Sequence, residues 1–410
     1  MGRPARSGVL ADRRFLLLAS ARTISVLGNG FGRIALAFGV LALPHSSPGR
    51  LSLVLAAQAL PQLVFVLFAG VLSDRFPRAR VMVGADLLAG LAYTALAVLV
   101  LSGRAPLAGL LIAAGLAGTG SALFLPAATG IVTEFVDVTE LQTANSWLRM
   151  GQNLALVSGL ASSGLVVAVA GAGWALAIDA VSFVLSAALI SAMRLPARVR
   201  IRSDSSWTQL RHGWREFVSR QWLWVVVVQF AFLLAAVSAT VGVLGPLLSE
   251  RDYGGARTWA LLIGAQALGT VAGAGLARKV RVRRPILVAV LMTAVMAVPM
   301  FALGLGAPLW LTGLAMFACG VASDIFGVLW VSTMQREIAE DVLSRVSAYD
   351  IFGSIAFAPL GLLVAGPVAV LVGIRPALVG CGCLALLATG AALLSPSVRG
   401  LRAELVNAAD

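Results

Sequence analysis

Five ionisable residues within the long apolar stretches of this 410-residue chain are candidates to carry chemistry: Arg22, Arg33, Asp86, Asp179 and Asp324. In a membrane such groups cost at least ~2.5 kcal/mol each on insertion scales, so they usually mark a pathway or pair with one another. Counting along alternating stretches puts Arg33 and Asp179 in the outer half of the membrane and the other three in the inner half. The chemistry that buried acids of this kind can perform is the uptake and release of a proton.

Asp324 is the leading proton-carrier candidate, because the two intramembrane arginines among these five, Arg22 and Arg33, both lie in the first half of the chain. The alternative for Asp324 is a satisfied polar contact with Ser323 or with a neighbouring helix. Arg33 and Asp179 match in depth, so they form either a structural ion pair, which costs less than two separate charges, or part of a coupling site. Asp86 is the remaining acidic candidate for proton coupling.

Twelve apolar stretches hold these residues, and each is about as long as a membrane-spanning helix. They cover residues 15–43, 51–73, 81–101, 106–130, 143–170, 172–194, 222–248, 258–277, 285–305, 308–331, 346–371 and 375–395. Lipid offers the backbone no hydrogen-bond partners, so continuously apolar segments must be helices. With 59% hydrophobic and 12% charged residues, the composition predicts an all-α membrane protein of twelve transmembrane helices.

The net charge of +13 has an explanation in membrane topology. If the first helix starts inside, arginine-rich and arginine-poor connections alternate, and the rich ones face the cytoplasm. This predicts a multi-pass membrane protein with both termini in the cytoplasm. Basic residues beside membrane ends meet anionic headgroups, so nucleic acid is not an expected partner.

The longest polar connection divides the chain into two six-helix bundles, residues 1–195 and 222–410, joined by a cytoplasmic amphipathic linker at 196–221. The halves also share a weak repeat about 202 positions apart, in which Trp147, Gly151 and Gly159 align with Tyr349, Gly353 and Gly361. A parallel repeat of two bundles around a central cleft is suited to alternating access.

A charged turn follows the second stretch and contains Gly70, Asp74, Arg75, Arg78 and Arg80. A carboxylate near an arginine or a helix terminus forms charge-assisted hydrogen bonds that can make and break between two conformations. The turn is therefore a candidate conformational latch. The alternative is a topology signal in which the arginines only hold the loop inside.

The segment Gly28-Asn29-Gly30-Phe31-Gly32 interrupts the first stretch near mid-membrane, where glycines either bend a span beside a cavity or permit close helix packing. Polar and aromatic side chains at membrane depth are candidates to line a substrate cavity. These candidates are Asn29, Phe31, Gln58, Gln62, Gln229, Gln266, Trp310, Phe326 and Trp330.

The turn at residues 70–80 resembles the G-x-L-x-D-R-x-x-R-x-R motif of the major facilitator superfamily. Phe124-Leu125-Pro126-Ala127-Ala128 and Leu141-Gln142-Thr143-Ala144-Asn145 resemble its branch of bacterial drug and siderophore exporters typified by the enterobactin exporter, as do residues 210–215 and 329–347. The resemblance implies the major facilitator fold and a location in a bacterial inner membrane. It further implies proton-driven export of a small hydrophobic or amphipathic molecule such as a drug, antibiotic or siderophore.

No G-x-x-x-x-G-K-[ST] run occurs, so ATP is not the expected energy source. Cys319, Cys381 and Cys383 lie within apolar stretches away from histidines and acids, and a buried apolar role is expected for them rather than a metal site. We expect a monomer without cofactor or metal and without enzyme activity. The alternatives are an importer or uniporter of a small nutrient, and less directly a membrane-embedded sensor or enzyme.

Overall fold

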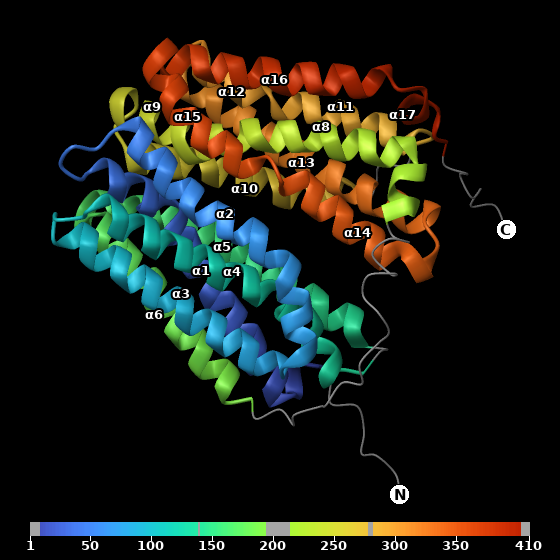
Figure 1. The fold of residues 1–410 in the computed structure, drawn as a ribbon, viewed down its shortest axis with the longest axis horizontal. Coiled ribbons are helices and arrows are strands. Elements are labelled where there is room, and N and C mark those ends of the chain that lie inside the picture. Colours follow the sequence, from blue (N-terminus) through green and yellow to red (C-terminus); the bar gives the residue numbers. More distant parts are fainter. Residues whose placement is uncertain (1–8, 138–139, 194–213, 278–281, 403–410) are drawn as a thin grey trace, which may run out of the picture. The chain divides into compact units, whose positions relative to one another are not determined.

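The computed structural model describes residues 9–137, 140–193, 214–277 and 282–402, with the backbone only at residues 66–75, 142, 340, 341, 344 and 345. The regular secondary structure of this described part is helical (Figure 1). In chain order the elements are η1 (Val9–Ala11), α1 (Arg13–Leu41), α2 (Pro48–Arg75), α3 (Arg78–Leu101), α4 (Leu107–Gly130), η2 (Val132–Glu134), α5 (Leu141–Ala170), α6 (Ala172–Ser191), α8 (Gln221–Ser238), η4 (Ala239–Leu244), α9 (Gly245–Asp252), α10 (Ala256–Ala277), α11 (Pro285–Met296), α12 (Val298–Gly304), α13 (Leu309–Glu337), α14 (Glu340–Ile355), α15 (Ala358–Val372), α16 (Ile374–Leu394) and α17 (Pro396–Gly400).

Eleven helical segments of the described chain are long and apolar enough to cross a membrane. The 28-residue helix α2 occupies the second expected stretch. Prolines explain why some spans consist of two helices. Pro299 begins α12 after the break at Ala297, and Pro359 begins α15 after α14, because proline cannot donate the backbone hydrogen bond that would continue the preceding helix.

The seventh span changes its helical form at η4, which is a π-helix. Pro246 follows in α9 and has no N–H to donate to the carbonyl of Gly242. The N–H of Gly245 instead reaches back five residues to the carbonyl of Thr240. The wider turn therefore accommodates the proline without ending the span.

The chain divides into two compact units, one comprising residues 1–201 with Tyr253–Ala260 and the other comprising residues 202–252 with 261–410. Within unit 1, α1 packs on α5 and α6, α2 on α4, and α3 on α4 and α6. Within unit 2, α8 packs on α14, α15 and α16, α11 on α13 and α16, and α12 on α16. Each unit thus repeats one pattern, in which its first span packs on its fifth and sixth.

The glycines that align in the sequence repeat make equivalent close contacts in the two units. A Cβ atom at Gly159 of α5 would collide with the carbonyl oxygen of Leu27 in α1, and one at Gly361 of α15 would collide with the carbonyl oxygen of Ala235 in α8. Glycine is required because each fifth span approaches the backbone of the first span of its unit. The internal packing of each unit is therefore consistent with a parallel repeat.

The first helix is continuous from Arg13 to Leu41, so the expected interruption at residues 28–32 does not occur. Its glycines serve close packing instead. A Cβ at Gly30 would lie 2.8 Å from the backbone of Gly159 in α5. Gly28 and Gly32 face α6 in the same way. Of the two explanations left open by the sequence, helix packing is the one that the structure supports.

Most of the predicted linker, including Trp207 and Leu210, lies outside the described residues. Its last part forms a helix at residues 214–219. Here Phe217 is buried, and Trp214 contacts the ring of Tyr349 in α14 at a centroid distance of 5.4 Å. The described end of the linker therefore packs on unit 2 through aromatic side chains.

Candidate functional site

The charged turn occupies the connection between α2 and α3. Gly70, Asp74 and Arg75 lie in the last turns of α2, where only the backbone is described. Pro77 follows as the N-cap of α3, so the sharp turn comes from a residue with a fixed φ angle that cannot continue α2. Arg78 is then the first residue of α3.

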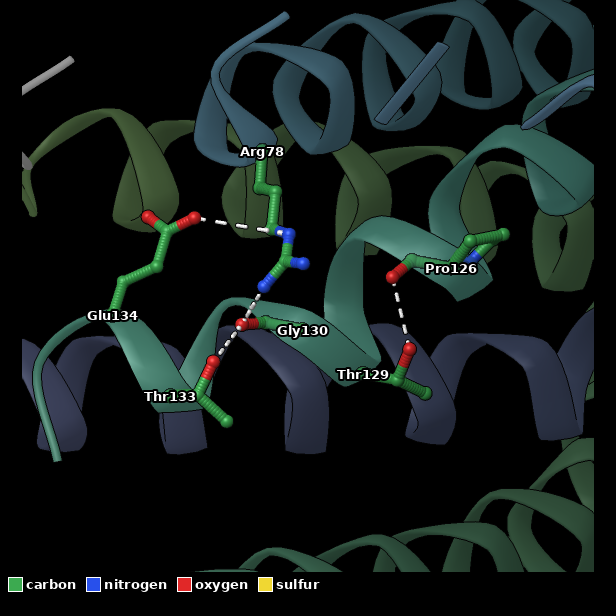
Figure 2. Close-up of polar contacts among 6 residues, drawn as sticks. All are labelled: Arg78, Pro126, Thr129, Gly130, Thr133 and Glu134. Atoms are coloured by element: carbon green, nitrogen blue, oxygen red, sulfur yellow. Dashed lines mark hydrogen bonds and ion pairs between the residues drawn. The ribbon is translucent and has the colours of Figure 1, made fainter. Parts of the chain in front are cut away.

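The side chain of Arg78 points to the C-terminal end of α4, as Figure 2 shows. Its Nη1 donates a hydrogen bond to the carbonyl oxygen of Gly130, the last residue of that helix. The same carbonyl accepts a hydrogen bond of 2.9 Å from the hydroxyl of Thr133. The Nε of Arg78 lies 3.7 Å from Oε1 of Glu134, and the Arg78 side chain is only 12% exposed. One guanidinium thus joins the start of α3 to the end of α4.

The physical basis of this contact is the unsatisfied carbonyl group at a helix C-terminus, where a cation is favoured by the helix dipole. A Cβ at Gly130 would occupy the place of the Arg78 guanidinium, so glycine is needed for the approach. Arg80, the other arginine of α3 in the motif, is exposed. Sequence reasoning did not identify Glu134 as a partner of Arg78, because nothing in its spacing pointed to α3.

A second polar site lies inside unit 1 around Asp179 of α6. Asp179 is fully buried. Its Oδ1 lies 3.4 Å from the Ser182 hydroxyl, which donates a shorter bond of 2.7 Å to the Asp179 carbonyl. Its Oδ2 has no hydrogen-bond partner among the described residues. Gly28 and Gly32 of α1 make room for this carboxyl group, since a Cβ on either would collide with it.

Three further polar side chains complete the Asp179 site. The hydroxyl of Tyr93 in α3 accepts a hydrogen bond of 3.0 Å from Nε2 of Gln58 in α2, and its ring stacks on Phe183 at 5.5 Å. Arg33 of α1 interacts electrostatically with both Asp179 and Tyr93. We call Arg33, Gln58, Tyr93 and Asp179 the polar cluster. Four helices of one unit contribute one member each.

Arg33 and Asp179 do not form a direct ion pair in the structure, although both are described. Arg33 is exposed on α1, whereas Asp179 is buried between α1, α3 and α6. The structure therefore brings the two charges near each other without neutralising the carboxylate by contact. Tyr93 was missed by sequence reasoning, and its signal was a rare tyrosine within an apolar span.

The other intramembrane charges occupy separate places. Asp86 of α3 is 1% exposed and lies beside Ser186 of α6. Arg22 of α1 lies near a second cation, Arg149 of α5. Asp324 of α13 is half-buried, and its Cβ lies 2.9 Å from the position of a Cβ on Gly273 of α10.

The hydroxyl of Ser323 donates its hydrogen bond to the carbonyl of Cys319, one turn earlier in α13, and not to the Asp324 carboxylate. A further acid, Asp350, was overlooked in the sequence although it lies within the Val346–Val372 span. Its carboxylate accepts a hydrogen bond of 3.1 Å from the indole of Trp330. Asp350 thus joins α14 to α13.

Several expected cavity residues are packed inside unit 2. Gln229 of α8 is buried, and its Nε2 donates to Thr293 of α11 at 2.9 Å and to Thr389 of α16 at 3.4 Å. Phe326 stacks on Phe230 at 4.8 Å. These contacts stabilise the interior of the unit, so cavity lining is not the role that the structure shows for Gln229 or Phe326.

The remaining expected cavity residues differ in exposure. Trp330 is buried beside Trp222, and Phe31 is buried on α1, whereas Trp310 is 72% exposed at the start of α13. Gln62 is exposed and Asn29 half-buried. Gln266 donates to Sγ of Cys319 at 3.5 Å.

The backbone contacts of Gln58 and Gln266 are equivalent in the two units. The carbonyl oxygen of Gln58 lies where a Cβ on Gly118 would stand, and that of Gln266 lies where a Cβ on Gly320 would stand. Each glutamine is therefore held at a close crossing of the second and fourth spans of its unit. This shared position was not visible in the sequence.

The cysteines are free. Cys319 is buried, Cys381 is half-buried and Cys383 is exposed on α16, so the expected burial is wrong for Cys383. Among the described residues, no group of three His, Cys, Asp or Glu side chains is placed to hold a metal ion.

Comparison with known proteins places these sites in context. A model of the Major Facilitator Superfamily matches residues 18–356, well over half of the chain. The multidrug efflux pump Tap of Mycolicibacterium fortuitum is 28% identical over 414 aligned positions, which cover 94% of this chain and 96% of Tap. YkuC of Bacillus subtilis (strain 168), an uncharacterized MFS-type transporter, is 27% identical over 192 residues, which cover 47% of this chain and 44% of YkuC.

Among solved structures, the nucleoside transporter NupG superposes with a TM-score of 0.72 at 12% identity, covering 93% of this chain and 98% of NupG. At this identity the likeness concerns the fold alone. The prediction of an all-α membrane protein with this transporter fold is thereby confirmed.

Proposed function

Since the chain belongs to the major facilitator superfamily of secondary transporters, we propose that it exports a small hydrophobic or amphipathic molecule in exchange for protons. The similarity to the efflux pump Tap extends over 94% of the chain and supports export of a drug-like compound. The enterobactin-exporter branch suggested by the sequence motifs supports the same direction of transport. The substrate class in this proposal covers drugs, antibiotics and siderophores.

The observation that carries proton coupling is the buried carboxyl group of Asp179. Its Oδ2 receives no hydrogen bond from any described residue. An ionised carboxylate with one oxygen that lacks a donor is costly in an apolar interior, and binding of a proton removes that cost. The nearby Arg33 charge favours the ionised form, so the balance between the two protonation states can change when Arg33 or its surroundings move.

In the proposed cycle, Asp179 takes up a proton at one side of the membrane and releases it at the other, while the substrate moves in the opposite direction. Tyr93 and Arg33 interact with it electrostatically, and the Ser182 hydroxyl lies beside its Oδ1. Asp324, which lies in unit 2, is the rival carrier, and Asp86 is a further acidic candidate. The two proposed bundles, residues 1–195 and 222–410, would rearrange so that the substrate site opens to one side of the membrane and then to the other. One chain would form the complete transporter, as a monomer.

The test is transport by the purified protein in lipid vesicles with an imposed proton gradient. Ethidium serves as the amphipathic test substrate, and a pH-sensitive dye trapped inside reports proton movement. We expect the gradient to drive ethidium accumulation, and we expect added ethidium to release protons in the opposite direction. Downhill ethidium flux that moves no protons would contradict antiport and favour a uniporter. No flux of ethidium or of other amphipathic cations and neutral drugs would contradict the proposed substrate class.

A further inference from the structure

A hollow of about 750 Å³ lies at the end of unit 1 where the α1–α2 and α3–α4 connections meet. None of the side chains proposed for transport lines it. Its lining residues, all of them described, are Leu43, Pro44, His45, Ser47, Gly49, Arg50, Leu53, Gly103, Arg104, Ala105, Pro106 and Leu107. Three of these side chains can carry a positive charge and none is acidic. The volume falls within the roughly 300–1,000 Å³ of typical ligand sites.

Arg50 lines this hollow and joins the two connections by hydrogen bonds. Its Nη1 donates to the carbonyl of Pro44 at 3.4 Å, and its Nη2 donates to the carbonyl of Ala105. Its Nε is buried and has no partner among the described residues. Among the described residues, the charge of Arg50 is thus met by neutral carbonyl groups only, and its guanidinium keeps N–H groups that donate to none of these residues.

Two helices begin at the hollow and add to its positive potential. α2 starts at Pro48 and α4 starts at Leu107, so the N-terminal ends of both helix dipoles lie at its edge. Backbone N–H groups at a helix N-terminus are suited to bind a phosphate group. The exposed side chains of Arg104 and His45 add two further donors at the rim.

His45 has a φ angle of 60°, in the left-handed region that residues other than glycine rarely adopt. Such a conformation persists only where the surrounding structure imposes it. The α1–α2 connection is therefore held in a defined shape that keeps His45 at the hollow.

We propose that this hollow binds the phosphate group of an anionic phospholipid. Cationic side chains and two helix N-termini meet without any acid, which favours an anion with several acceptor oxygens. The hollow lies at the ends of membrane-spanning helices, which is the level of the lipid headgroups. Leu43, Leu53 and Leu107 supply apolar contacts for the glycerol and the first acyl carbons.

Native mass spectrometry can measure the lipid that the protein keeps when it is released from nanodiscs of equal phosphatidylglycerol and phosphatidylcholine. We expect the wild type to retain phosphatidylglycerol in excess. Arg104→Gln removes a charged donor that is exposed and unnecessary for packing, and it should lower this retention about tenfold. Arg251→Gln, which removes an arginine that is 74% exposed elsewhere on the chain, should leave retention unchanged.

A second variant distinguishes loss of the charge from a folding defect caused by replacing Arg104. Arg104→Lys keeps the charge and should retain more phosphatidylglycerol than Arg104→Gln. Equal retention of both lipids by the wild type would overturn the proposal, and so would equal loss in Arg104→Gln and Arg251→Gln. Equilibrium dialysis of the detergent-purified protein with inorganic phosphate provides the last arm. Arg104-dependent binding of phosphate without retained lipid would overturn the lipid as the source of the phosphate group.

Discussion

Arg78, the first residue of α3, donates a hydrogen bond to the carbonyl of Gly130, the last residue of α4. The contact satisfies a helix-terminal acceptor with a charged donor, and Glu134 lies on the other side of the same guanidinium. It gives the arginine-rich turn a specific partner within unit 1 in addition to any role in membrane topology. We propose that it acts as the latch expected from the motif.

Arg78→Gln and Gly130→Ala should both slow transport severalfold while leaving the protein folded. Glutamine removes the charge, and the new methyl group at residue 130 displaces the end of a flexible arginine side chain rather than any backbone atom. A cation at a helix C-terminus is worth about 0.3–2 kcal/mol, so the loss of thermal stability should be small. Vesicle transport rates and thermal unfolding in detergent measure the two effects.

Arg80→Gln is the matched control for the latch, because Arg80 is exposed and belongs to the same helix. It should transport at close to the wild-type rate. If all three variants transport normally, the arginines of this turn serve topology alone.

Asp179→Asn should abolish gradient-driven accumulation while downhill exchange of substrate continues. The amide is a permanent neutral mimic of the protonated acid, so substrate can move but no proton moves with it. Asp324→Asn should keep gradient-driven accumulation if Asp179 is the carrier. Paired flux measurements with and without a proton gradient, on protein whose monodispersity has been checked, separate the two residues.

The reverse pattern, with accumulation lost in Asp324→Asn and kept in Asp179→Asn, would move the carrier to unit 2. Accumulation that survives in both variants would exclude each of them as the carrier.

Gly32→Ala should destabilise the protein, whereas Gly84→Ala should not. A Cβ at Gly32 would collide with the Asp179 carboxylate and lie 3.0 Å from the ring of Tyr93, and both neighbours are buried. Apart from its chain neighbours and the adjacent backbone of its own helix, no heavy atom lies within 4 Å of a Cβ at Gly84. Overpacking in a close-packed interior costs about 1–3 kcal/mol.

Intrinsic fluorescence from the nine tryptophans can follow thermal unfolding of both glycine variants. Equal unfolding temperatures would show that α1 and α6 adjust to the methyl group and that the glycine is dispensable there.

Membrane orientation predicts which introduced cysteines react from outside the cell. In a background without the three native cysteines, Ser47→Cys should react with an impermeant reagent in intact cells, and Ser205→Cys should not. The reason is the concentration of arginine on the side that is expected to be cytoplasmic. Labelling at residue 205 together with protection at residue 47 would invert the proposed topology.

The twelve apolar stretches were enough to predict the helical spans, because lipid requires every spanning segment to satisfy its own backbone. Helix ends were predicted within a few residues where proline or glycine marked them, as at Leu107 and Gly171. The π-helix before Pro246 was not predicted, since hydropathy does not register a change in hydrogen-bond pattern.

Residues that could carry charge at membrane depth were visible in the sequence, and Asp179 and Arg33 were among them. The contact geometry between Asp179 and Arg33 was not visible in the sequence, because it depends on how α1 and α6 cross. Gly28 and Gly32 have no side chain, so the Asp179 carboxyl group packs directly against α1 at this crossing. In that position its Oδ2 has no donor among the described residues. Sequence spacing places residues on a helix face but does not specify what the neighbouring helix presents there.

What the sequence by itself determined is that lipid is the solvent of this protein and where its helical spans lie, since these follow from the length and apolarity of local segments. Only the tertiary structure decided that Gln229 bonds to two threonines inside unit 2 and that Arg78 caps α4. Such contacts join residues that are 52 to 160 positions apart in the chain. They depend on helix packing, which is a property of pairs of surfaces and is not encoded in the periodicity of either helix alone.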